Sequence, residues 1–159
     1  MSKSLARVRA ALTAAGFDAE AVREMPDSTR TAVEAAAAVG CALDQIVKSI
    51  VFRGEASGHI RLFLTAGGNR IDPDRAAALA GEALGRADAD LVRRETGFAI
   101  GGVAPLGLIA PGSVPVWMDP RLCDFALVWA AAGTPRHVFS AEPRALAAAA
   151  GARIAPFTA

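Results

Sequence analysis

The stretch best suited to chemistry through the main chain is residues 96–107, Thr-Gly-Phe-Ala-Ile-Gly-Gly-Val-Ala-Pro-Leu-Gly. Glycine can take positive φ and lets another group approach the backbone closely, and proline fixes φ and removes an N–H donor. The apolar residues between them can anchor the stretch to a core. A tight turn between strands is the alternative, but four glycines with one proline favour a shaped loop whose amides and carbonyls contact a ligand.

Lys48 is the most informative charged residue, because it lies inside the apolar run 46–52. If this run is a strand, alternation places Lys48 on the same face as Ile46, Ile50 and Phe52. A lysine on an apolar face is costly unless it is paired or opens to a site. Two alternatives stay open: an edge strand on which Lys48 reaches water, or a pocket rim where the ammonium pairs with a phosphate or polarises a carbonyl.

Other polar residues give weaker signals. His137 follows the turn at 133–135, and a lone histidine is more often structural than catalytic. Asp119 precedes a proline at a predicted strand end, where turn capping is as well supported as a site role. Neither Ser49 nor Thr96 has an obvious partner base, so a serine nucleophile is poorly supported. No residue spacing predicts a metal cluster.

The elements that must position these residues are expected to form one α+β domain over residues 1–159, with a mixed, mostly antiparallel β-sheet covered by helices. Turn-forming residues between two β-type runs, 46–52 and 60–65, predict a hairpin. Further extended segments are expected over 17–24, 114–118, 125–130 and 137–139. Capping patterns predict that helices begin at Ser4, Thr31, Asp72, Asp88 and Ser140.

Composition bounds the class of protein. A chain of 159 residues with 53% hydrophobic residues can bury one core. The net charge of +1 argues against binding of nucleic acid by bulk charge, so no DNA partner is expected, although Arg93 and Arg94 leave room for a local basic patch. Cys41 and Cys123 fit no metal or disulfide spacing and are expected to be buried thiols. Without a signal-peptide pattern or a membrane-length apolar run, we expect a cytoplasmic protein with no membrane partner.

Three motifs occur in the order found in one known family: Lys48 within residues 45–52, the glycine loop at 96–107, and the turn at 133–138. The chain resembles the YbaK family, the free-standing relatives of the editing domain inserted in bacterial prolyl-tRNA synthetases. The likeness runs from about Thr31 to the final helix, and the glycine loop is its most specific motif.

The resemblance implies a trans-editing aminoacyl-tRNA deacylase, which hydrolyses the ester between a wrong amino acid and the 3′ acceptor end of a tRNA. The implied substrate is tRNA-Pro carrying alanine or cysteine, or a serine- or threonine-type mischarge. Water is the implied attacker, oriented by the ribose hydroxyl of the substrate, and no cofactor is implied. An aminoacyl-tRNA synthetase is a further candidate partner. The alternative is a non-catalytic module of the same fold that binds a tRNA acceptor end, a synthetase or a nucleotide.

The resemblance also implies roles for single residues. Gly101 through Pro105 match a loop whose backbone holds the ester and the water, and Lys48 matches a lysine that engages the phosphate or the ester. Two departures from the family bear on amino-acid specificity: Ser49 replaces a common threonine, and Ala131-Ala132-Gly133 replaces a serine-glycine pair. The expected catalytic residues are Lys48, Gly101, Gly102 and His137; the expected substrate-binding residues are Ser49, Phe98, Val103, Ala104, Pro105 and Asp119; no metal ligand is expected.

Overall fold

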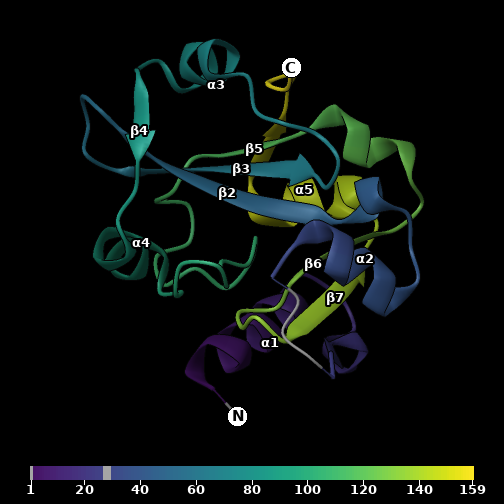
Figure 1. Ribbon diagram of the computed structural model, residues 1–159. Coiled ribbons are helices and arrows are strands. Elements are labelled where there is room, and N and C mark those ends of the chain that lie inside the picture. Colours follow the sequence, from purple (N-terminus) through teal and green to yellow (C-terminus); the bar gives the residue numbers. More distant parts are fainter. Residues whose placement is uncertain (1, 27–29) are drawn as a thin grey trace.

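The computed structural model describes residues 2–26 and 30–159 and contains two β-sheets with helices packed around them (Figure 1). The larger sheet has the strand order β4-β2-β3-β5-β8, and the smaller has the order β1-β7-β6. The helices are α1 (Lys3–Ala14), α2 (Ala32–Val39), α3 (Pro73–Ala80), α4 (Ala89–Thr96) and α5 (Pro143–Ala150). The strands are β1 (Arg23–Glu24), β2 (Val47–Gly54), β3 (Ile60–Ala66), β4 (Leu84–Arg86), β5 (Val116–Met118), β6 (Val128–Ala131), β7 (His137–Ala141) and β8 (Ala152–Ile154).

The predicted hairpin is the centre of the larger sheet. Strands β2 and β3 pair antiparallel, with Lys48 opposite Thr65, and they cross the middle of the molecule in Figure 1. Strand β5 joins β3 in parallel, and β8 joins β5 in parallel. The remaining strand pairs are antiparallel, so the predicted α+β class with mixed, mostly antiparallel strands is confirmed. The strands divide between two sheets, and the space between these sheets becomes important below.

Most predicted helix starts are confirmed by the caps. Thr31 accepts a hydrogen bond from Glu34 N–H, and Asp72 and Asp88 cap α3 and α4 in the same way. Two were wrong. Ser2, not Ser4, caps α1, and Glu142, not Ser140, caps α5, because Ser140 is a paired residue of β7. Of the expected extended segment 17–24, only Arg23–Glu24 is a strand, after a 3₁₀ turn at Ala19–Ala21.

The larger sheet is buried on both faces, and this decides where the side chains of β2 point. Leu62 and Leu64 of β3 face the main core, whereas Phe63 between them stacks on Trp117 with ring centroids 4.9 Å apart in a second apolar cluster. Ile50 and Phe52 of β2 pack on that second cluster. By strand alternation Lys48 shares their face, and Ser49 shares the face of Val47 and Val51, which pack in the main core.

The two cysteines do not match the expectation of buried thiols. Cys41 and Cys123 are both partly exposed, and neither forms a disulfide. Cys41 packs beside α2, and Cys123 packs against the main core. Partial burial raises the pKa of each thiol, because loss of water disfavours the thiolate.

Candidate functional site

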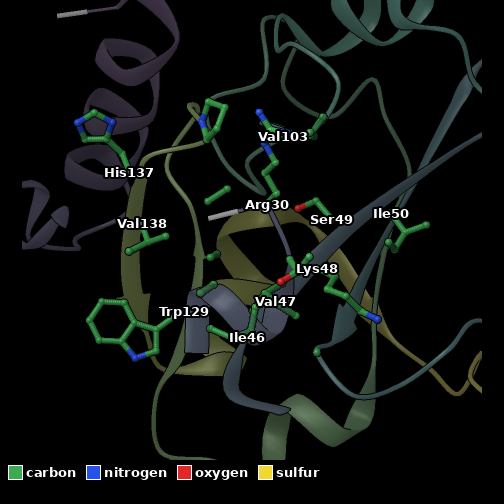
Figure 2. Close-up of a pocket in the computed structure, with 18 of the residues that line it drawn as sticks. Arg30, Ile46, Val47, Lys48, Ser49, Ile50, Val103, Trp129, His137 and Val138 are labelled. Atoms are coloured by element: carbon green, nitrogen blue, oxygen red, sulfur yellow. The ribbon is translucent and has the colours of Figure 1, made fainter. Parts of the chain in front are cut away.

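A cavity of about 480 Å³ lies between the two sheets. Its walls come from β2, the start of α2, the glycine loop, β6, β7 and the turn before β7, as Figure 2 shows. A parallel bridge between Ile46 and Trp129 connects the two sheets beside it. The lining residues are Arg30, Thr31, Ala32, Val33, Ala35, Ile46, Val47, Lys48, Ser49, Ile50, Gly67, Gly101, Val103, Trp129, Ala130, Ala131, Thr134, Pro135, His137 and Val138.

The glycine loop meets this cavity through a tight turn. Gly102 N–H donates to the carbonyl of Ala99 at 2.9 Å, and Gly101, the third residue of the turn, has φ of 87°. Positive φ at that position is the geometry of a type II turn, which favours glycine. Within residues 2–26 and 30–159, the amides of Gly101 and Val103 have no hydrogen-bond acceptor. The turn therefore offers main-chain donors at the cavity wall.

Arg7 of α1 fixes both ends of the glycine loop. Its Nη2 donates to the carbonyl of Gly97 at 2.6 Å, and its Nε donates to the carbonyl of Gly107 at 3.1 Å. The guanidinium carbon also lies 5.0 Å from the ring centroid of Phe98. Phe98 is fully buried and does not line the cavity, so it anchors the loop from behind.

Lys48 and Ser49 both line the cavity, but their side chains lie on opposite faces of β2. Its Nζ donates to the carbonyl of Asn69 at 2.7 Å, and Figure 2 shows Lys48 and Ile50 extending to one side of the strand. Burial lowers the pKa of Lys48, Arg70 lowers it further, and Asp119 and Asp44 act in the other direction. An ammonium has three donors, so two remain for a ligand.

Ser49 is an unpaired hydroxyl in the cavity. Its Oγ is buried and has no hydrogen-bond partner in the described part of the chain. Figure 2 shows it directed toward Arg30. No base contacts it, so the structure offers no activated serine. A buried polar group without a partner costs about 1–3 kcal/mol, and a bound ligand that pairs with the hydroxyl would recover this free energy.

His137 is held by two neighbours at the far side of the cavity. Its Nδ1 lies 2.7 Å from Thr134 Oγ1, which also accepts a hydrogen bond from Arg136 N–H at 3.1 Å. Which of the two groups donates to the other depends on the tautomer of the imidazole ring. Nε2 lies 3.9 Å from Glu24 Oε2. These contacts fix the imidazole ring and, through it, the hydroxyl of Thr134.

The glycine loop and the histidine turn lie against each other. A Cβ built on Gly102 would be 3.7 Å from Cα of Thr134, so the two segments are in van der Waals contact. The main-chain donors of the loop and the hydroxyl of Thr134 therefore belong to adjacent parts of one wall. Both segments were singled out from the sequence, but their contact joins residues far apart in the chain.

Asp119 acts as a cap outside the cavity. It is 2% exposed, and its Oδ2 accepts hydrogen bonds from Ala66 N–H at 3.1 Å and from Asn69 Nδ2 at 2.9 Å. Its Oδ1 accepts from Arg121 N–H at 3.0 Å. The structure thus gives Asp119 the capping role that the sequence left open, and Asp119 also holds Asn69, the partner of Lys48.

The cavity brings together half of the predicted site residues. Lys48, Ser49, Gly101, Val103 and His137 line it. The other predicted residues, Gly102, Phe98, Ala104, Pro105 and Asp119, support the wall from outside it.

The cavity-lining residues that were not predicted as site residues include Arg30, Thr31, Trp129 and Thr134. Arg30 and Trp129 fit no motif in the sequence, Thr31 was identified only as a helix cap, and Thr134 only as part of the turn at 133–138. Their positions in the sequence could have identified them, because Arg30 and Thr31 directly precede α2 and Thr134 lies in the turn before His137.

Metal-binding clusters and membrane-spanning helices were sought among the described residues 2–26 and 30–159. In this part of the chain, no three His, Cys, Asp or Glu side chains lie close enough together to hold a metal ion. None of its helices combines the length and the apolar character that a membrane span requires.

Comparisons with known proteins show which proteins this chain resembles. The sequence profile of aminoacyl-tRNA editing domains matches residues 26–149. The uncharacterised protein YwhH of Bacillus subtilis is 32% identical over 125 residues, which cover 79% of this chain and 78% of YwhH. A crystal structure of a candidate trans-editing enzyme for prolyl-tRNA synthetase is 47% identical, with a TM-score of 0.88 over 100% of this chain and 99% of that one. A structure from work on grafting epitope backbones onto scaffold proteins is 46% identical, with a TM-score of 0.89 over the same shares.

Proposed function

The chain belongs to the aminoacyl-tRNA editing domain family, and we propose that it is a trans-editing deacylase that hydrolyses the ester bond of mischarged tRNA. The observation that carries the proposal is the turn at Gly101: Gly101 and Val103 line the cavity together with Lys48, and their amides have no acceptor among the described residues. The 47% identity to a candidate trans-editing enzyme for prolyl-tRNA synthetase supports it. Residues 1–159 would act as one editing-type domain.

In the proposed reaction a water molecule attacks the carbonyl carbon of the ester. The bond from that carbon to the terminal ribose oxygen breaks, and the products are the free amino acid and a tRNA whose ribose hydroxyl has regained a proton. The amides of Gly101 and Val103 are proposed to donate to the oxyanion, and such donors contribute about 3 kcal/mol each. Lys48 also lines the cavity, and its positive charge is proposed to stabilise the negative charge that develops on the same oxygen.

The attacking water has no ionised side-chain base beside it in this proposal. The neighbouring ribose hydroxyl of the substrate is proposed to orient the water. Thr134 Oγ1 contacts His137, and the main chain of Thr134 lies beside Gly102, so we propose that this hydroxyl hydrogen bonds to the same water. His137 is therefore proposed to act as a positioning residue through Thr134. Fixing ester and water together lowers the barrier by removing orientational freedom.

The proposed amino acid is small. The cavity wall contains the small residues Gly67, Ala130 and Ala131, which leave room for a small side chain. Alanine or cysteine on tRNA-Pro, or a serine- or threonine-type mischarge, would fit such a wall. The unpaired hydroxyl of Ser49 is proposed to hydrogen bond to the amino acid. An apolar pocket distinguishes one methylene by only about 10–200-fold, so Ser49 would supply part of the selection.

The proposed partners follow from the substrate. Mischarged tRNA would be met in the cytoplasm, and an aminoacyl-tRNA synthetase that releases it is a second proposed partner.

A panel of tRNAs carrying wrong amino acids tests the proposal. Purified protein is incubated with tRNA-Pro carrying alanine, cysteine, serine or threonine, and with correctly charged tRNA-Pro, and ester loss is followed against a protein-free control. We expect accelerated loss from one or more of the mischarged tRNAs and none from the correct one. Binding of these tRNAs without accelerated ester loss would replace the deacylase with the non-catalytic binding module.

A further inference from the structure

Arg30 stands at the mouth of the cavity, immediately before the residue that caps α2. Its side chain is exposed and lines the cavity, and Figure 2 shows it beginning beside Ser49 and running toward Val103. Ser49 Oγ is buried below it, so the two residues mark the outer and inner parts of the same wall. A ligand that reaches Ser49 therefore passes Arg30.

The charge of Arg30 is uncompensated in the described part of the chain. No carboxylate of residues 2–26 and 30–159 lies within salt-bridge distance of it, and its guanidinium makes no hydrogen bond there. The nearest acid along α2, Glu34, instead accepts a hydrogen bond from Thr31 Oγ1 at 3.0 Å. Of the residues that the structure describes, those that line the cavity include no acid, and their ionisable groups are Arg30, Lys48 and His137. A cavity lined in this way attracts an anionic group.

Lys48 is less suited to hold that anion than Arg30. The ammonium of Lys48 donates to the carbonyl of Asn69 and lies among the charges of Asp119 and Asp44, on the opposite face of β2 from Ser49. Among residues 2–26 and 30–159, no acceptor takes a hydrogen bond from the Arg30 guanidinium. A guanidinium also matches two oxygens of a phosphate with two parallel N–H donors, which an ammonium does not.

We propose that Arg30 binds the phosphodiester group that precedes the terminal adenosine of the tRNA, and so fixes the depth at which the aminoacyl ester enters the cavity. This inference rests on the proposed function, because it takes the acceptor end as the ligand. The aminoacyl group then lies toward Ser49 and the turn at Gly101, the ribose lies between, and the phosphate lies at the exposed mouth.

The test uses two stable analogues of the acceptor end. Both are adenosine with alanine attached at the 3′ position through an amide, and one of them carries a 5′-phosphate. Dissociation constants are measured for wild type, Arg30→Ala, Arg30→Lys and the control Arg153→Ala, which removes an exposed arginine of the edge strand β8. Circular dichroism and thermal unfolding check that each variant is folded.

We expect wild type to bind the phosphorylated analogue about tenfold or more tightly than the other, because a charge-assisted contact is added. Arg30→Ala should lose this preference, Arg30→Lys should keep a part of it, and Arg153→Ala should keep all of it. In hydrolysis of the tRNA identified by the panel, Arg30→Ala should raise KM about tenfold with little change in kcat. An undiminished phosphate preference in Arg30→Ala overturns the proposal, and so does equal binding of both analogues by wild type.

The two proposals fail in different ways. A phosphate preference that depends on Arg30 in a protein that hydrolyses none of the tRNAs would support the anion site and overturn the deacylase. Hydrolysis by Arg30→Ala with unchanged KM would overturn the role of Arg30 and leave the deacylase supported.

Discussion

At the scale of the residue, Lys48 and Ser49 are neighbours in the sequence with different surroundings. Strand alternation turns Lys48 toward the carbonyl of Asn69 and turns Ser49 toward the space below Arg30. The ammonium of Lys48 makes one hydrogen bond and has further donors, whereas the hydroxyl of Ser49 has no partner in the described chain. Changing each of them should therefore affect activity and stability differently.

For Lys48→Ala we predict a fall in kcat/KM for deacylation of about ten- to hundredfold, the range expected when a charged hydrogen-bond donor is removed. The fold should persist, because the loss inside the protein is one hydrogen bond to Asn69, worth about 1 kcal/mol. Single-turnover hydrolysis and urea unfolding measure the two effects. The exposed Lys3→Ala is the control for charge. A wild-type rate in Lys48→Ala would remove Lys48 from the proposed site.

For Ser49→Ala we predict that the free energy of unfolding stays the same or rises by about 1 kcal/mol, because an unsatisfied buried hydroxyl is removed. Binding of the mischarged tRNA should weaken at the same time. Urea unfolding and the KM of deacylation test this combination. A loss of stability of more than about 1 kcal/mol would mean that the hydroxyl has a partner within the folded protein.

At the scale of the element, α1 controls the glycine loop although it lies outside the region matched by the family profile. Residues 26–149 match that profile, whereas Arg7 comes from the preceding helix and bonds to both Gly97 and Gly107. Two carbonyls ten residues apart are thus held by one guanidinium. This contact limits how far the turn at Gly101 can move.

For Arg7→Ala we predict lower stability, by about 1–3 kcal/mol, because two hydrogen bonds and the contact with Phe98 are lost. Deacylation should also slow, although Arg7 does not line the cavity. Hydrogen exchange of residues 97–107 should become faster. Arg7→Lys should show the same losses to a smaller extent, since an ammonium retains the charge but lacks the planar set of donors of a guanidinium. Unchanged exchange in Arg7→Ala would show that the loop holds its shape without α1.

The elements that the sequence predicts well are those specified by local patterns. Thr31, Asp72 and Asp88 each cap a helix through a hydrogen bond to a residue two or three positions later, and the β2–β3 hairpin follows from two apolar runs around a turn. Strands β1, β4 and β8 have only two or three residues, so their sequence carries no period that could reveal them.

The site itself was predictable only in part. Lys48, Gly101 and His137 stood out by residue type, and the cavity brings all three to its wall. Arg30 and Thr134 did not stand out, because their roles depend on which distant segments the fold brings beside them, such as Ser49 for Arg30 and Gly102 for Thr134. The bonds of Arg7 to the glycine loop were hidden for the same reason.

At the scale of the whole molecule, the charges are nearly balanced, with a net charge of +1, while the described residues that line the cavity include cations and no acid. Acidic residues elsewhere in the protein form contacts that stabilise the fold. Glu82, before β4, accepts hydrogen bonds from Ala56 N–H and Ser57 N–H and pairs with Arg61 at 2.8 Å, with 9% of its side chain exposed. This carboxylate connects the tip of the β2–β3 hairpin to the turn after α3.

Acid should weaken this connection. The Ser57 amide lowers the pKa of Glu82, and Ala56 and Arg61 contribute against the opposing effect of burial. A folded-state pKa below the unfolded value means that the stabilisation is present above about pH 4.3 and is lost as the pH falls through the folded pKa. We predict that the free energy of unfolding falls less steeply with acid in Glu82→Gln than in wild type. Glu20→Gln, at an exposed carboxylate, controls for total charge, and identical acid profiles for Glu82→Gln and wild type would contradict the prediction.

The central claim is that a turn of the main chain at Gly101 promotes hydrolysis, and a pair of glycine variants tests it most directly. Gly101 and Gly112 have φ of 87° and 82°, and a Cβ at either position meets no atom within 4 Å, so Gly101→Ala and Gly112→Ala should carry the same backbone strain of about 1–2 kcal/mol. Only Gly101 lines the cavity. In single-turnover hydrolysis of the mischarged tRNA identified by the panel, the account predicts a rate at least about tenfold lower for Gly101→Ala and a rate close to wild type for Gly112→Ala. Equal rates for the two variants would contradict it.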